Sequence, residues 1–132
     1  MSNNPFEIAD QIVTEVKADI YMVDFHAEAT AEKLAMGHFL DGRITGLFGT
    51  HTHIPTADNR ILPKGTGYIT DLGMTGPSNS ILGMDIKTAL IRFVKSLPEK
   101  YKVAEGPVEL NGAIFDIDDE TNKVKRVYRV HL

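Results

Sequence analysis

The order of helix-like and strand-like segments in the first fifty residues restricts this chain to a small set of folds. Residues 4–17 begin with Asn and Pro, as many helices do, and continue with apolar residues at helical spacing. The apolar run 20–25 lacks clean alternation, which is typical of a strand covered on both faces. A helical pattern over 27–40 and a strand-like run over 44–48 follow. This order predicts an α/β fold whose parallel strands are joined by crossover helices.

The later part of the chain predicts one more parallel strand, a helix and a terminal β-hairpin. The expected segments are a loop over 50–65, a strand over 67–72, a loop over 73–80, a helix over 86–97 and hairpin strands over 108–117 and 123–130. Loops at the carboxyl ends of parallel strands are where α/β proteins place their sites. We therefore expect the functional residues in the first two loops or at the strand ends before them.

Composition narrows the class of protein further. A chain of 132 residues without repeats or linkers predicts one domain over 1–132. It has no cysteine, which excludes disulfides and thiolate metal sites, and no apolar run long enough to cross a membrane. Met1 is not followed by a signal peptide, so we expect a cytoplasmic protein. The formal net charge is −4, and no basic groove for double-stranded nucleic acid is predicted.

Histidines follow two of the expected strands. His26 ends the first strand, and the Gly-Thr-His-Thr-His run places His51 and His53 just after the second. In an extended backbone residues two apart point to the same side, and neutral imidazole is the commonest protein metal ligand. The alternative is a pair of surface histidines in a loop, because the motif is short. His38 is expected on a helix surface or at the edge of the core, and His131 is expected in solvent.

Three histidines and a water could bind one zinc ion, whereas a pair of ions would also need oxygen ligands. The carboxylates available near the strand ends and loops are Asp24, Glu28, Asp58 and Asp71. Asp24 precedes His26 by two residues, so it could ligate, orient a ligand, or simply end a strand. The residues alone therefore predict a histidine-rich metal site, hydrolytic or structural.

Three longer motifs carry a resemblance to a known family. They are VDFHAEAT at 23–30, GTHTHIPTAD at 49–58 and TDLGMTGP at 70–77. In this order they resemble the YmdB-type metallophosphoesterase family, which is related to calcineurin-like phosphoesterases and acts on 2′,3′-cyclic nucleotides. The resemblance covers nearly the whole chain, and the Asn-Pro-Phe run at 4–6 is also similar to the family.

The resemblance implies a fold and a ligand set. The fold would be a portion of an αββα sandwich, with parallel strands, crossover helices and a C-terminal hairpin. His26 and His51 would serve one divalent ion and His53 a second, with iron, manganese or zinc as the metal. The acids named above, together with Thr52 and Thr75, would support the ligands or form the substrate loops. The substrate would be a small phosphodiester.

The resemblance also implies that part of the site lies elsewhere. Family members carry a preceding half that supplies a metal-binding Asp, a bridging Glu, an Asn ligand and a proton-donating His. Those motifs are absent here, so the chain looks like the C-terminal half alone, and we expect it to be an incomplete catalyst by itself. It would associate with an N-terminal half or with itself. The alternative is a non-catalytic α/β domain that binds a metal or phosphate and assembles with a partner.

Overall fold

Parallel strands form the centre of the molecule, as the sequence predicts. In the computed structural model, which describes residues 4–132, the main sheet has the strand order β1-β2-β4-β3. β1 (Met22–His26), β2 (Gly46–Thr50) and β4 (Gly67–Ile69) run parallel, while β3 (Arg60–Ile61) pairs antiparallel with β4. The expected parallel α/β sheet is therefore confirmed, with one antiparallel strand at its edge.

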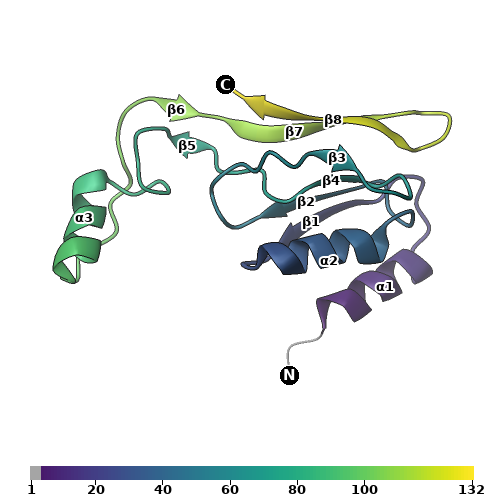
Figure 1. The fold of residues 1–132 in the computed structure, drawn as a ribbon, viewed down its shortest axis with the longest axis horizontal. Coiled ribbons are helices and arrows are strands. Elements are labelled where there is room, and N and C mark those ends of the chain that lie inside the picture. Colours follow the sequence, from purple (N-terminus) through teal and green to yellow (C-terminus); the bar gives the residue numbers. More distant parts are fainter. Residues whose placement is uncertain (1–3) are drawn as a thin grey trace.

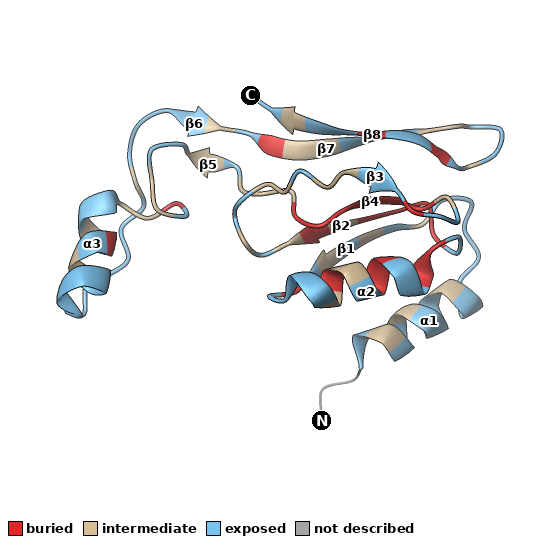
Figure 2. Ribbon diagram, in the orientation of Figure 1, coloured by how far each residue is buried: buried red, intermediate tan, exposed pale blue. Residues whose placement is uncertain are grey.

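Two helices lie on one side of this sheet (Figure 1). α1 (Pro5–Glu15) begins after Asn4, whose side chain accepts a hydrogen bond from the Phe6 amide. α2 (Thr30–Leu40) packs its buried stripe against the strands, and Figure 2 shows buried residues gathered on α2, β2 and β4. The central cluster consists of Met36, Leu40, Ile44, Leu47, Leu62 and Tyr68. The packed core thus lies between the sheet and α2.

A hairpin covers the opposite side of the sheet, where β7 (Asn111–Ile117) pairs antiparallel with β8 (Val124–His131). Phe115 packs over two glycines, one on β2 and one on β4. A Cβ added at Gly46 would come within 2.9 Å of the Phe115 ring, and one at Gly67 within 2.8 Å. Glycine at both positions therefore allows the hairpin to approach the sheet closely. The C-terminal β-hairpin expected from the sequence is therefore present as β7 and β8.

A third part extends from one end of these layers (Figure 1). It contains α3 (Ile86–Lys95) and a two-stranded pair formed by β5 (Gly76–Pro77) and β6 (Val108–Glu109). Asp85 caps the helix by accepting a hydrogen bond from the Thr88 amide. Much of α3 is exposed, including large apolar side chains. None of the helices formed by residues 4–132 has the length and apolar character that a membrane span requires.

Several boundaries differ from the expectations. β1 ends at His26 as predicted, whereas β2 extends beyond its predicted end at 48 to Thr50, which pairs with His26 in the ladder. α2 begins at Thr30 rather than 27. β4 stops at Ile69 instead of 72, since Thr70 and Asp71 are engaged by loop residues. The first loop contains β3, and the expected strand 108–117 is divided into β6 and β7.

Candidate metal site at the strand ends

His26 and His51 meet at the carboxyl ends of β1 and β2. Nε2 of His26 lies 3.3 Å from Nδ1 of His51, and the ring centroids are 5.1 Å apart in an edge-to-face arrangement. Both side chains are exposed. The sheet register explains the meeting, because His26 pairs with Thr50 and His51 is the next residue along the chain. The two histidines therefore lie at the same end of the sheet.

Polar groups from both strands lie on the Nδ1 side of the His26 ring. Nδ1 of His26 lies 3.0 Å from the hydroxyl oxygen of Thr50. That hydroxyl donates in turn to Oδ1 of Asp24, at 3.2 Å. Asp24 is thus placed behind His26, two residues back on the same strand face. Of the three roles considered for Asp24, this contact corresponds to orientation of the histidine.

The backbone of the His-Thr-His run is not extended. β2 ends at Thr50, and the two histidines that follow have positive φ angles, 130° at His51 and 64° at His53. The expectation that both imidazoles share one strand face is therefore wrong, because the strand ends at Thr50, three residues before His53. Positive φ is uncommon outside glycine and costs about 1–3 kcal/mol per residue, and such residues cluster at functional sites.

His53 faces a different segment. Its Nδ1 lies 3.1 Å from the carbonyl oxygen of Leu82, in the turn before α3. A histidine that donates one ring N–H to a carbonyl keeps its other nitrogen available, which is the usual arrangement of metal-bound histidines. His53 therefore has Nε2 as its free nitrogen, and its hydrogen-bonding contact is with the Leu82 carbonyl rather than with His26 or His51.

A buried ion pair holds the histidine loop in place. Nζ of Lys33 lies 2.8 Å from Oδ2 of Asp71, and both side chains are fully buried. Lys33 also donates to the Thr50 carbonyl at 3.2 Å, while Asp71 accepts from the Thr52 amide at 2.9 Å. The pair therefore forms hydrogen bonds with the backbone on both sides of His51. Burial alone would raise the pKa of Asp71, but hydrogen bonds from Lys33 and from the amides of Thr52 and Gly73 hold it below its usual range.

Asp58 stabilises the later part of the same loop by joining it to Thr70, the residue after β4. It accepts hydrogen bonds from the Thr70 amide at 3.1 Å, from the Thr70 hydroxyl, and from the Thr56 hydroxyl at 2.7 Å. Burial opposes ionisation, yet these bonds lower the pKa of Asp58. The carboxylate oxygens of Asp58 and Asp71 therefore already accept hydrogen bonds from loop amides and hydroxyls and, for Asp71, from Lys33. Both support the loop, which is one of the roles expected for them.

The remaining expected positions are Thr52, Glu28 and Thr75. Thr52 donates its hydroxyl to the Ile54 carbonyl and accepts from the Ile54 amide, which closes a local turn. Glu28 and Thr75 are exposed. Across residues 4–132 the structure shows no hydrogen bond that ties either side chain to a histidine. His38 is exposed on α2 as expected, and His131 is exposed while its Nδ1 contacts Oδ1 of Asn111 at 2.9 Å.

The pair formed by His26 and His51 fits a metal ion. Two nitrogens bound to a tetrahedral zinc ion at about 2.0–2.1 Å lie about 3.3 Å apart, the separation that these rings already have. Within residues 4–132, however, no three His, Cys, Asp or Glu side chains converge closely enough to hold an ion together. The described residues thus bring two imidazole nitrogens together, with a third histidine nearby in sequence, and a complete coordination shell would require further groups.

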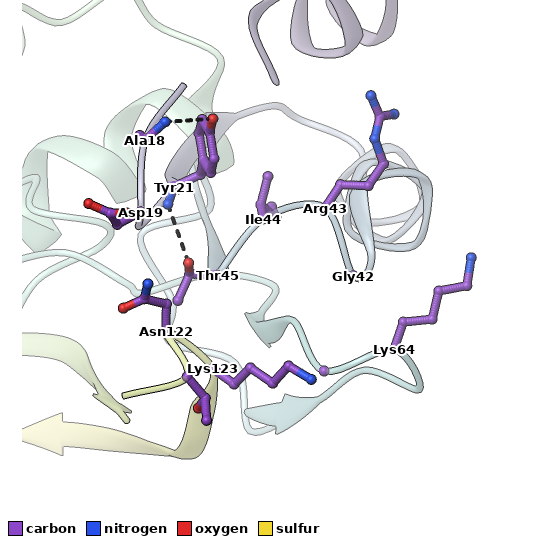
Figure 3. A pocket seen from close by; sticks show the side chains of 12 residues that line it. Ala18, Asp19, Tyr21, Gly42, Arg43, Ile44, Thr45, Lys64, Asn122 and Lys123 are labelled. Atoms are coloured by element: carbon purple, nitrogen blue, oxygen red, sulfur yellow. Dashed lines mark hydrogen bonds between the residues drawn. The ribbon is translucent and has the colours of Figure 1, made fainter. Parts of the chain in front are cut away.

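A cavity lies at the other end of the sheet (Figure 3). It has a volume of about 360 Å³ and is lined by residues that precede β1, β2 and β4 and by the turn between β7 and β8. Arg43, one of its lining residues, is engaged by Asp10 at 2.7 Å on the helix side. This cavity contains no histidine and is not part of the candidate metal site.

Two contributors to the site were not predicted from the sequence. Lys33 stands on the buried stripe of α2 with Met36, Gly37 and Leu40. A lysine at such a position signals a buried partner, because an unpaired buried charge is strongly unfavourable. Thr50 could have been found only by assigning the β1–β2 register, which pairs it with His26.

Together, the parallel sheet and the histidines at its carboxyl edge define an α/β protein with a candidate metal site where such folds usually place their ligands. Residues 1–130 match the family model described as YmdB-like protein. The chain belongs to this family.

Known proteins similar to this chain support the assignment. A Bacillus subtilis protein named 2′,3′-cyclic-nucleotide 2′-phosphodiesterase is 52% identical over 97% of this chain and 49% of its own length. A solved phosphatase structure from Mycoplasma pneumoniae has a TM-score of 0.94 and 39% identity, covering 100% of this chain and 47% of that one. A solved structure of a Thermus thermophilus protein has a TM-score of 0.90 and 40% identity, over 98% and 51% of the two chains. The chain therefore spans about half the length of the relatives it matches.

Proposed function

We propose that this chain supplies the histidine side of a dinuclear metal site in a phosphodiesterase that acts on 2′,3′-cyclic nucleotides or related phosphodiesters. The observation that carries the proposal is the 3.3 Å separation between Nε2 of His26 and Nδ1 of His51. The names of the Bacillus subtilis and Mycoplasma pneumoniae relatives support phosphoester hydrolysis as the reaction class.

In this proposal His26 and His51 hold one ion, and Nε2 of His53 is presented to the second. The metal is iron, manganese or zinc, which accept mixed imidazole and oxygen ligation. When bound, the ions would stabilise charge on the phosphoryl oxygens and lower the pKa of the attacking water. Lys33 and Asp71 keep the histidine loop in its strained conformation. The bridging carboxylate and the proton donor would come from residues outside this sequence that correspond to the unmatched part of the relatives.

One observation favours a second function. Residues 4–132 bring only two histidines together, and the acids nearest the loop are already occupied by hydrogen bonds. A non-catalytic domain that binds one metal ion or a phosphate and assembles with a partner would need no more than this. The two functions differ in whether hydrolysis appears when the remaining groups are provided.

The test combines metal analysis with a phosphodiesterase assay. The chain is measured alone and after mixing with a polypeptide that spans the part of the Bacillus subtilis relative not matched here. We expect weak or no hydrolysis of a 2′,3′-cyclic nucleotide by the chain alone and a gain of at least about a hundredfold in the mixture, because general acid groups alone contribute about 10²–10⁴.

Single substitutions test which histidines the activity requires. His26→Ala and His51→Ala should abolish the gain in activity, whereas His38→Ala, on the exposed surface of α2, should leave it unchanged. Metal uptake without any hydrolysis in the mixture would favour the non-catalytic domain. Family-like turnover by the chain alone would show that its own residues complete the site.

A further inference from the structure

We infer that Thr50, backed by Asp24, is a positioning residue that fixes the proton of His26 on Nδ1 and so keeps Nε2 free to bind a metal. The inference deepens the proposed function and rests on it for the role of the metal. Its structural basis is the continuous set of contacts from Asp24 through the Thr50 hydroxyl to His26, at 3.2 and 3.0 Å.

The sheet register creates this arrangement. His26 pairs with Thr50 across the β1–β2 ladder, and Asp24 pairs with Phe48 two residues earlier. Side chains at directly opposed and diagonal positions of neighbouring strands lie within reach of one another on the same face. The three polar groups are thus brought together by regular parallel pairing at the end of a rigid sheet, which gives them more precise positions than a loop would.

Counting hydrogens determines the direction of each bond. A carboxylate only accepts hydrogen bonds, so the hydroxyl of Thr50 must use its single hydrogen to donate to Asp24. The same oxygen can then only accept from His26, which requires a hydrogen on Nδ1. In neutral imidazole the other nitrogen carries a lone pair. That nitrogen, Nε2, is the one 3.3 Å from His51.

The opposite tautomer is disfavoured for two reasons. With its hydrogen on Nε2, His26 would place a lone pair on Nδ1 against the occupied oxygen of Thr50. It would also direct an N–H at the position where a metal must bind. Histidine ligands commonly donate their second ring N–H to a carboxylate or a similar acceptor, and loss of such a partner typically costs about 10–100-fold in metal affinity. Here the acceptor for the second ring N–H is the Thr50 hydroxyl, which Asp24 orients by accepting its hydrogen.

The first arm of the test needs no metal. Long-range ¹H–¹⁵N spectra of the metal-free chain at about pH 8, where free histidine is neutral, report which ring nitrogen of His26 is protonated. We expect the hydrogen on Nδ1 in the wild type and in Thr50→Ser, which keeps the hydroxyl. In Thr50→Val the hydrogen should redistribute toward Nε2. Asp24→Asn should act in the same direction, because its amide can donate to Thr50 and let the hydroxyl donate to Nδ1.

A matched control separates tautomer control from general structural damage. Thr45 bridges the same two strands at their other end, where its hydroxyl accepts from the Tyr21 amide at 3.3 Å. Thr45→Val should leave the His26 spectrum unchanged. A wild-type His26 protonated on Nε2, or a folded Thr50→Val variant with the wild-type spectrum, would overturn the inference.

The second arm measures Zn²⁺ affinity by competition with a chelator. We expect Thr50→Val to bind about 10–100-fold more weakly than the wild type, with Thr50→Ser close to wild type. Equal affinity of Thr50→Val and wild type would overturn the positioning role while leaving the metal site intact. If no variant binds Zn²⁺ but the tautomers respond as expected, the proposed function fails and the tautomer assignment is upheld.

Discussion

Nζ of Lys33 lies 2.8 Å from Oδ2 of Asp71, and solvent reaches neither side chain. The pair joins the buried face of α2 to a position two residues beyond the end of β4. Its further hydrogen bonds reach the backbone on both sides of His51 and the amide of Gly73. A structural ion pair is therefore built directly beneath the candidate metal site. Its integrity should affect both the stability of the fold and the geometry of the histidines.

Replacing Lys33 by Met should destabilise the protein strongly. The substitution leaves Asp71 charged and buried without its partner, and breaking a buried pair in this way costs about 3–5 kcal/mol. The free energy of unfolding from urea titration provides the measurement. As a control, Asp10→Ala removes the exposed ion pair with Arg43 and should cost no more than about 1 kcal/mol. Equal losses in the two variants would contradict the role assigned to Lys33.

Stability should fall at acidic pH through Asp58 and Asp71. Both have a pKa below the ordinary value in the folded protein, because hydrogen bonds to their carboxylates outweigh burial. Such groups stabilise the fold fully above the unfolded pKa of about 3.9, and this contribution is lost as pH falls through the folded pKa.

Urea unfolding at about pH 7, 4 and 2 measures this effect. Asp58→Asn should be less stable than the wild type at neutral pH and should lose less stability on acidification. The expectation would fail if the wild type and this variant showed the same dependence on pH.

Metal should be released on acidification. Ligating imidazoles must be neutral, and free histidine titrates near about 6.5. A bound ion competes with protons for the same nitrogens, so release should occur below that value. The metal content after dialysis at about pH 4 is the measurement. Retention of metal at that pH would show that groups other than histidines hold it.

The isolated chain should associate with itself. α3 exposes a strongly apolar surface, with Phe93 at 77% and Val94 at 75% of full exposure. Exposed apolar surface of this kind favours association. The solution mass, measured by light scattering over a range of concentrations, should exceed that of one chain, and Phe93→Lys should lower it. A wild-type chain that stays monomeric at high concentration would refute the expectation.

The strands and helices could be predicted from sequence because their signals are local. The unbroken apolar run before His26 and the helical spacing that follows it each depend on a few neighbouring residues. The same run placed His26 at the correct end of the sheet. The Phe115 packing over Gly46 and Gly67 could not be read in this way, since it joins segments far apart in the chain.

The conformation of the histidine loop could not be predicted for a related reason. His51 and His53 adopt positive φ angles because distant groups hold the loop. Asp71 binds the Thr52 amide from 19 residues away, and the Leu82 carbonyl lies 29 residues from His53. A pattern two residues long carries no information about such partners. The assumption of an extended backbone was therefore wrong, although His26 and His51 still come together.

The anomalous signal of zinc in crystals of the chain soaked with Zn²⁺ would test directly whether His26 and His51 bind one metal ion. We predict an anomalous peak about 2.0–2.1 Å from both Nε2 of His26 and Nδ1 of His51. The peak should be absent in crystals of His51→Ala and present in those of His38→Ala. Crystals with ordered density for both rings and no zinc between them, or with zinc bound only elsewhere, would contradict it.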